Sequence, residues 1–200
     1  MAQTNTREEI IRKGAELIHV QGFNATGLQQ ILQAAGIPKG SFYFYFKSKE
    51  DFGLAVIDYF SVMINGIFVH YLKDKKIPPL KRLEKLMDFF ENTFRQSGNT
   101  RGCPIGNLSL ELADTNERLR IHLAGVVESL IEKIEFCLKD AKLGKSIPAE
   151  LNTADMARFI FQGFEGAVLH MKVLKSIEPF HAFRGFMKGY IKQIKAPEKK

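Results

Sequence analysis

Hydrophobic residues recur along this chain at intervals of three and four positions, which is the spacing of one face of an α-helix. Ile10, Ile11, Leu17 and Ile18 show this interval near the N-terminus, and it returns through most of the sequence. We find no alternation of apolar and polar residues of the kind that marks a half-buried strand. The pattern therefore predicts an all-α fold with about nine helices.

Four helices are predicted in the first part of the chain, at residues 6–20, 26–36, 38–45 and 48–73. Gly22 ends the first of them, because glycine readily adopts the left-handed conformation that closes a helix. Thr26 with Gln29, and Ser48 with Asp51, have the spacing of a capping box at a helix N-terminus. The first three helices form a small domain, which we predict over residues 1–50.

Further helices are predicted at residues 78–97, 104–113, 114–143, 153–171 and 179–194. Pro78 and Pro79 start the first of these, and the loop from Gly144 to Pro148 separates the third from the fourth. Their amphipathic pattern predicts a larger helical domain over residues 51–200.

The composition favours a cytoplasmic protein. We find no run of 18 apolar residues, so no membrane span is predicted, and residues 1–9 lack the apolar stretch of a signal peptide. The two cysteines, Cys103 and Cys137, are too few for a disulfide framework and have no CxxC spacing, so we interpret both as free thiols. We also expect no cofactor and no metal, since the five histidines are scattered and no catalytic motif is evident.

The net charge of +7 suits a polyanionic partner. Residues 1–50 carry a net charge of only +2, however, while residues 172–200 carry +6. We interpret this basic tail as a solvated surface. A protein that binds a membrane surface is an alternative, but Lys192, Lys195, Lys199 and Lys200 have no flanking lipid anchor. A helical enzyme is the other alternative, and it lacks a recognisable motif.

Two short helices joined through Gly36 and Pro38 have the proportions of a helix-turn-helix, whose second helix reads the major groove of DNA. The five aromatic residues from Phe42 to Phe46 cannot all be buried by one short helix. Phe42 and Phe46 are predicted to face the core. Tyr43 and Tyr45 have a polar tip that can donate to a phosphate oxygen.

Residues 6–60 resemble the DNA-binding domain of the TetR family of transcriptional regulators. The resemblance rests on Gly22-Phe23, Thr26, Ile31, Ala34-Ala35-Gly36-Ile37, Lys39-Gly40-Ser41-Phe42-Tyr43-Phe44-Tyr45-Phe46 and Lys47-Ser48-Lys49-Glu50. It implies a DNA-binding regulator, most often a repressor, that binds a palindromic operator on double-stranded DNA as a homodimer.

The resemblance also implies a role for individual residues. Lys39, Gly40 and Ser41 would approach base edges and phosphates, Tyr43 would contact a phosphate, and Lys49 would clamp the DNA backbone. Thr26 would cap the second helix and help its amide end to meet a phosphate. The chain departs from the family pattern at Pro38, where a serine cap is common, and at Gly27, where a second hydroxyl residue is common.

Beyond residue 60 the resemblance implies a chamber for a small-molecule effector and a dimer interface formed by residues 153–194. Candidate chamber residues are Phe90, Phe94, Cys103, Asn107, Glu111, Phe161, Phe164, Glu165 and His170. Ordinary core packing is the alternative for the aromatic residues, and a solvated or capping carboxylate is the alternative for Glu111. Gly163 and Gly166 leave small surfaces at which helices can approach closely.

Cys103 is a candidate sensor thiol. It lies beside Arg101 at the predicted start of a helix, and both features favour the reactive thiolate. Residues 101–108 also resemble a segment of TetR relatives that respond to electrophiles. An inert packing cysteine is the alternative, and we predict that role for Cys137, which lies in the middle of a helix.

Overall fold

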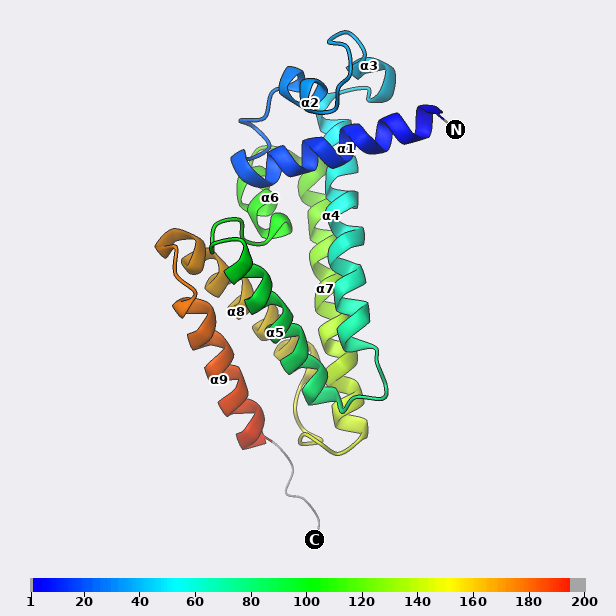
Figure 1. The fold of residues 1–200 in the computed structure, drawn as a ribbon. Helices are drawn as coiled ribbons and strands as arrows, with labels where there is room; N and C mark the ends of the chain where they lie inside the picture. Colours follow the sequence, from blue (N-terminus) through cyan, green and yellow to red (C-terminus); the bar gives the residue numbers. More distant parts are fainter. Residues whose placement is uncertain (1, 195–200) are drawn as a thin grey trace. The chain divides into compact units, whose positions relative to one another are not determined.

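The computed structural model describes residues 2–194, so Lys195, Lys199 and Lys200 of the basic tail lie outside the described residues. Within that range the chain is all α-helical, as predicted (Figure 1). The nine helices described are α1 (Ala2–Gln21), α2 (Leu28–Ala34), α3 (Phe42–Tyr45), α4 (Lys49–Leu72), α5 (Pro79–Gln96), α6 (Pro104–Leu112), α7 (Glu117–Leu143), α8 (Thr153–Leu174) and α9 (Glu178–Ile194).

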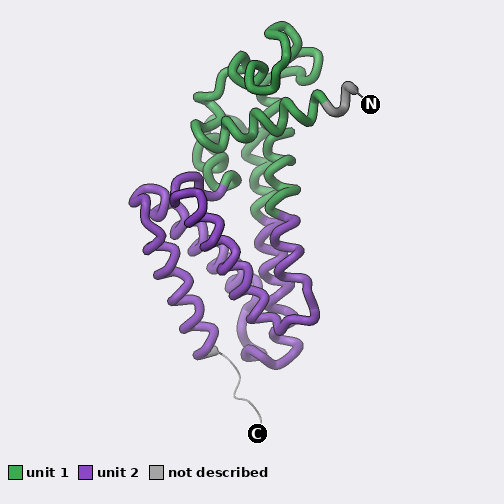
Figure 2. The backbone as a smooth tube through the Cα atoms, in the orientation of Figure 1, with its two compact units in different colours: residues 1–64, 104–127 green, residues 65–103, 128–200 purple. Residues whose placement is uncertain are grey.

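The helices group into two compact units, and neither unit is a single stretch of chain (Figure 2). The first unit contains residues 1–64 and 104–127, and the second contains residues 65–103 and 128–200. α4 and α7 therefore each contribute residues to both units. The domain boundary that the sequence predicts after residue 50 falls at the start of α4, inside the first unit.

Aromatic side chains fill the core of the first unit. The rings of Phe42 and Phe46 lie 5.3 Å apart, and Phe46 meets Phe52 of α4 edge to face at 5.0 Å. α1 approaches this cluster through Gly14, where an added Cβ would lie 2.4 Å from the Phe52 ring. Any larger residue at this position would push α1 away from α4, because a packed core leaves no room for extra atoms.

α4 is long and apolar enough, by composition, to cross a membrane. In the structure 44% of its most apolar stretch is buried inside the molecule. Phe52, Val56 and Ile57 of α4 are completely buried. The helix begins as predicted, with the Ser48 hydroxyl accepting a hydrogen bond from the Asp51 backbone N–H at 3.0 Å.

The predicted capping box at α2 is wrong by one residue. Gly27 is the N-cap, and its backbone N–H donates to the side-chain oxygen of Gln30 at 2.9 Å. Gln29 is exposed and has no part in the cap. Glycine tolerates the N-cap position almost as well as a hydroxyl residue, so the helix loses little stability by starting there.

A second aromatic cluster forms the core of the second unit. Phe164 of α8 lies 4.9 Å from Phe90 and 5.7 Å from Phe180, and Phe94 meets Phe180 edge to face at 5.3 Å. These rings join α5, α8 and α9. Edge-to-face contacts of this kind add about 0.5–1.5 kcal/mol each to the burial of the rings.

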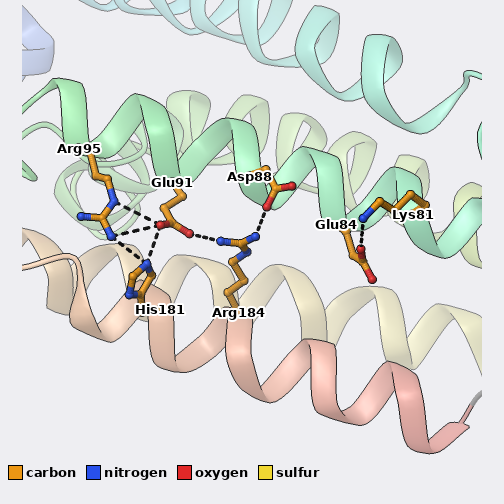
Figure 3. Close-up of polar contacts among 7 residues, drawn as sticks. All are labelled: Lys81, Glu84, Asp88, Glu91, Arg95, His181 and Arg184. Atoms are coloured by element: carbon orange, nitrogen blue, oxygen red, sulfur yellow. Dashed lines mark hydrogen bonds and ion pairs between the residues drawn. The ribbon is translucent and has the colours of Figure 1, made fainter.

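A polar network also joins α5 to α9 within the second unit (Figure 3). Glu91 of α5 accepts hydrogen bonds from Arg184 and Arg95, and it contacts the His181 ring nitrogen Nε2 at 2.6 Å. Arg184 also donates to Asp88. Burial tends to raise the pKa of Glu91, but the hydrogen bonds from His181, Arg184 and Arg95 outweigh it and hold that pKa below 4.5.

Candidate nucleic-acid interface

The segment predicted to read DNA is a turn followed by one short helix. The Ser41 N–H donates to the Pro38 carbonyl at 3.0 Å, and α3 begins only at Phe42, so the predicted helix from residue 38 is shorter than expected. Lys39 and Gly40 are exposed on this turn, and Ser41 is half-buried. The turn therefore presents a cation and an open backbone position to solvent.

The five aromatic residues from 42 to 46 divide into buried anchors and residues that are exposed at the surface. Phe42 and Phe46 are 2% and 1% exposed, which confirms that both face the core. Tyr43 and Phe44 are 70% and 68% exposed. Tyr45 is half-buried, with its ring against Phe44 at 5.1 Å.

Phe44 was missed by the sequence interpretation, which expected the tyrosines to face outwards. The exposure of Phe44 could have been predicted from the spacing of the buried residues. Phe42 and Phe46 are one helical turn apart, so residues 43 and 44 lie on the opposite face of the helix. An exposed phenylalanine ring next to a basic turn is unusual at a solvated surface. Such a ring suits apolar contact with a thymine methyl group.

Lys49 is held against the loop between α1 and α2. Its ammonium group lies 4.8 Å from the centre of the Phe23 ring, and its Nζ donates to the Asn24 carbonyl at 3.3 Å. Burial lowers the pKa of Lys49, and the nearby Glu111 carboxylate partly offsets that effect. The side chain of Lys49, the first residue of α4, is thus held by the loop between α1 and α2.

Glu111 was predicted to line the effector chamber, but its carboxylate binds the loop between α1 and α2. It accepts the backbone N–H of Phe23 at 2.8 Å and that of Asn24 at 2.7 Å. Gly22 turns the chain here with φ of +90°, which leaves the two amides without helical partners. The structure therefore agrees with the alternative that Glu111 is a capping carboxylate, although the amides it caps, those of Phe23 and Asn24, are distant in the sequence.

Thr26 is also corrected. It is completely buried, and its hydroxyl donates to the Gly22 carbonyl at 2.5 Å while it accepts from the Gln21 side-chain amide at 3.2 Å. A phosphate cannot reach a hydroxyl in this position. Thr26 closes the turn after α1 instead of contacting DNA.

Three polar contacts hold the start of α7 to α4 within the first unit. Glu50 accepts hydrogen bonds from the Asn116 amide and the Arg118 guanidinium, both at 2.9 Å, and these contacts lower the Glu50 pKa. His122 contacts Asp58 at 2.7 Å. The N-terminal part of α4, which includes Lys49, is thereby held against the start of α7.

The predicted effector residues belong to both units. Phe90, Phe94 and Phe164 share the aromatic cluster with Phe180, and Phe161 is buried nearby on the same helix as Phe164. Asn107 is half-buried on α6 and belongs, with Glu111, to the first unit.

His170 is a further correction, because it is exposed on α8. It follows Glu165 by five residues, which rotates its side chain by about 140° around the helix. The two side chains therefore lie on different faces of α8.

The two cysteines lie in different surroundings. Cys137 is completely buried in α7, its thiol donates to the Pro79 carbonyl at 3.1 Å, and burial raises its pKa to about 12. Cys103 is buried directly before α6. Burial raises the pKa of Glu165 on α8, and Cys103 lowers it by a smaller amount. The prediction that Cys137 is a buried packing residue is confirmed.

Two family models match the chain. Residues 10–56 match a model described as bacterial regulatory proteins of the tetR family. Residues 79–187 match a model described as the C-terminal domain of tetracyclin repressor-like proteins. Together they include the helix-turn-helix and most of the second unit.

Similar proteins agree with these matches. The chain is 31% identical over 183 residues to the HTH-type transcriptional repressor DhaR of Mycobacterium sp. (strain GP1), covering 92% of this chain and 90% of DhaR. It is 32% identical to the transcriptional regulator AcuR of Cereibacter sphaeroides, covering 88% and 80%. The crystal structure of reduced NemR from E. coli is 28% identical and covers 98% of this chain and all of that one (100%), with a TM-score of 0.87.

These matches extend over both units of the structure, and proteins of this kind are transcription factors without enzymatic activity. The exposed turn and aromatic residues at α3 lie within the segment that matches the tetR-family model. The chain belongs to the TetR family of DNA-binding transcriptional regulators.

Proposed function

We propose that this regulator is a cytoplasmic repressor that binds a palindromic operator as a homodimer and is released by a small-molecule effector or by modification of Cys103. The observation that carries the proposal is the exposed pair Tyr43 and Phe44, displayed beside Lys39 and anchored by two buried phenylalanines. A twofold dimer presents two such segments, which is the arrangement that reads a palindrome.

Each residue of this surface has a proposed contact. Lys39, Gly40 and Ser41 approach base edges and phosphates, while the Tyr43 and Tyr45 hydroxyls donate to phosphate oxygens. Lys49 is a backbone clamp, because its ammonium group needs only to leave one carbonyl to reach a phosphate.

Exposed apolar residues on α8 and α9 support the dimer. Phe159, Leu169 and Val173 of α8 are 50%, 43% and 69% exposed, and Phe186 of α9 is 62% exposed. Gly166 has no atom within 4 Å of its Cβ position, so a partner helix could approach the chain closely there. Exposed apolar surface on two adjacent helices is typical of an interface between subunits.

α6 offers a route from Cys103 to the DNA-binding loop. It begins with the residue after Cys103, and Glu111 in its last turn holds the amides of Phe23 and Asn24. A displacement at the start of so short a helix moves its end as well, and would disturb the loop that holds Lys49.

The DNA contacts are tested with fragments that the pure protein selects from random DNA. We expect Lys49→Ala to weaken binding to all selected fragments alike and to lower the slope of log affinity against log salt by about one unit. Lys139→Ala is the matched control, since this exposed lysine lies on α7 in the second unit. Unchanged affinity in a variant that lacks both the Tyr43 hydroxyl and the Lys49 ammonium would refute this surface.

Release is tested on the same fragments with N-ethylmaleimide. The wild-type protein and Cys137→Ser are expected to dissociate, and Cys103→Ser is expected to stay bound. Retention of DNA by the alkylated wild-type protein would rule out release through a thiol, and it would leave the DNA contacts standing.

A further inference from the structure

Phe44 of α3 is the most exposed phenylalanine of the described residues, at 68%. The exposed rings of Phe159 and Phe186 lie on α8 and α9 and belong to the surface proposed for the dimer. The ring of Phe136 on α7 has the Lys73 ammonium group 5.9 Å from its centre. Phe44 belongs to the first unit, and none of the individual contacts proposed above involves it.

The backbone around Phe44 is held in place on both sides. Its N–H donates to the Ser41 carbonyl at 3.2 Å, and the Phe46 N–H donates to the Phe42 carbonyl at 3.0 Å. Phe42 and Phe46 are buried and fix the orientation of α3, and the Phe44 ring meets the Tyr45 ring edge to face at 5.1 Å. The exposed ring is therefore presented from a rigid segment, which favours a selective contact.

The charges around Phe44 indicate the kind of partner. Residues 25–49 contain no aspartate or glutamate, and they include Lys39, Lys47 and Lys49. Lys39 and Lys47 are exposed. A surface with several cations and no carboxylate suits the phosphates of DNA.

Tyr43 and Phe44 leave α3 in different directions, because neighbouring residues differ by about 100° around a helix axis. When Tyr43 faces the DNA backbone, Phe44 is free to face the groove. A phenylalanine ring offers no conventional hydrogen-bond donor or acceptor, so the base edges that it can recognise are apolar. The apolar group that the major groove displays is the C5-methyl group of thymine.

We propose that Phe44 packs against the C5-methyl group of one pyrimidine in each operator half-site and makes DNA binding sensitive to that methyl group. This inference rests on the proposed binding of α3 in the major groove. 5-Methylcytosine carries the same methyl group at the same ring position as thymine. A cytosine at this place in the operator is therefore bound more tightly when it is methylated, and repression responds to cytosine methylation as well as to base sequence.

The experiment uses the DNA fragments that the pure protein selects, with each thymine of a half-site replaced in turn by uracil. Uracil keeps the hydrogen-bonding groups of thymine and lacks only the methyl group. We expect one position in each half-site at which uracil weakens wild-type binding by about fourfold, which corresponds to the burial of one methyl-sized group. Replacement in both half-sites should weaken binding by about fifteenfold, since the two contacts are independent.

Phe44→Ala connects this effect to the ring. At the sensitive position the variant should bind the thymine and uracil duplexes alike, and its salt dependence should match that of the wild type because no phosphate contact is lost. Phe44→Leu keeps an apolar side chain and should retain part of the preference for thymine. Tyr43→Phe is the matched control, because it removes a hydroxyl group proposed to contact a phosphate and should weaken both duplexes equally.

Sensitivity to cytosine methylation is measured with two further duplexes. The sensitive thymine–adenine pair is replaced by a cytosine–guanine pair in one and by a 5-methylcytosine–guanine pair in the other. The wild-type protein should bind the methylated duplex about fourfold more tightly than the unmethylated one. Phe44→Ala should not distinguish between them.

A uracil effect that persists in Phe44→Ala, or wild-type binding that uracil leaves unchanged at every thymine, would overturn the proposal. Equal losses of affinity for the thymine and uracil duplexes in Phe44→Ala would also overturn it, because the ring would then stack on bases without reading the methyl group. Lys49→Ala distinguishes the two proposals. If it weakens binding while uracil does not, the methyl contact fails and the DNA-binding surface stands, and if neither change weakens binding, the surface itself fails.

Discussion

The second unit contains two carboxylates with little exposure to solvent, Glu91 on α5 and Glu165 on α8. Their pKa values are shifted in opposite directions. Glu91 is surrounded by Arg95, His181 and Arg184, and its pKa is lowered (Figure 3). Glu165 has a buried oxygen, Oε1, without a hydrogen-bond partner among the described residues, and burial raises its pKa. The same functional group thus stabilises the fold at one position and destabilises it at the other.

The difference shows which of the two carboxylates holds the fold together. Both oxygens of Glu91 have hydrogen-bond partners, and those to His181 and Arg184 connect α5 to α9, so a proton or ligand would have to compete with an arginine. Glu165 holds no helix in place through an ion pair, and its free oxygen can accept a proton without loss of a contact. The comparison therefore assigns a structural role to Glu91 that Glu165 does not share.

The largest expected effect is on folding, at Glu91. Glu91→Ala removes the shared acceptor of three side chains and leaves Arg184 with Asp88 alone. We expect the free energy of unfolding in urea at pH 7 to fall by about 2–4 kcal/mol, near the cost of breaking a buried ion pair. Glu84→Ala is the control, because its pair with Lys81 is exposed and should contribute less than about 1 kcal/mol. Equal losses in the two variants would contradict the assignment.

The pH dependence of stability follows from the same group. Because the folded state lowers the Glu91 pKa from 4.5, its contribution is fully present above that pH and is lost as the pH falls below it. Wild-type protein should lose stability on acidification through this range more steeply than Glu91→Gln. The check is urea unfolding at intervals between pH 6 and the lowest pH at which the protein stays folded, and parallel curves would contradict the prediction.

α8 itself provides a further comparison, between its buried and exposed faces. An added Cβ at Gly163 would lie 2.7 Å from the Phe183 ring of α9, whereas at Gly166 nothing lies within 4 Å. Gly163→Ala should therefore destabilise the protomer by about 1–2 kcal/mol through overpacking. Gly166→Ala should leave the protomer at least as stable, since alanine favours a helix, and should weaken the dimer. Analytical ultracentrifugation that shows an unchanged dimer for Gly166→Ala would remove this residue from the interface.

The sequence predicted those features that depend on neighbouring residues. Periodicity located the longer helices because each needs only its own apolar face, and the usual burial of phenylalanine predicted correctly that Phe42 and Phe46 face the core. The cap of α2 was misplaced because Thr26 and Gln29 match the spacing rule as well as Gly27 and Gln30 do. Only the fold shows that the Thr26 hydroxyl is taken by Gly22.

Contacts between distant residues could not be predicted in this way. Glu111 binds amides 87 and 88 residues away, and no local pattern indicates such a partner. The same is true of the pair Glu91–Arg184. Cys103 and Glu165 were each selected from the sequence as chamber residues, but the effect of Cys103 on the Glu165 pKa appears only when α8 is packed into the second unit.

The smallest effect, and the one that most sharpens the comparison, is expected for Glu165→Gln. Because the folded state raises the Glu165 pKa above 4.5, the ionised group costs stability once the pH exceeds the folded pKa. The neutral amide removes this cost, so we expect unfolding at pH 8 to require more free energy than in the wild-type protein. At pH 4 both side chains are uncharged in the folded state, and the two proteins should unfold alike. A loss of stability at pH 8 would mean that Glu165, like Glu91, holds the fold together, and the distinction between the two carboxylates would then have to be abandoned.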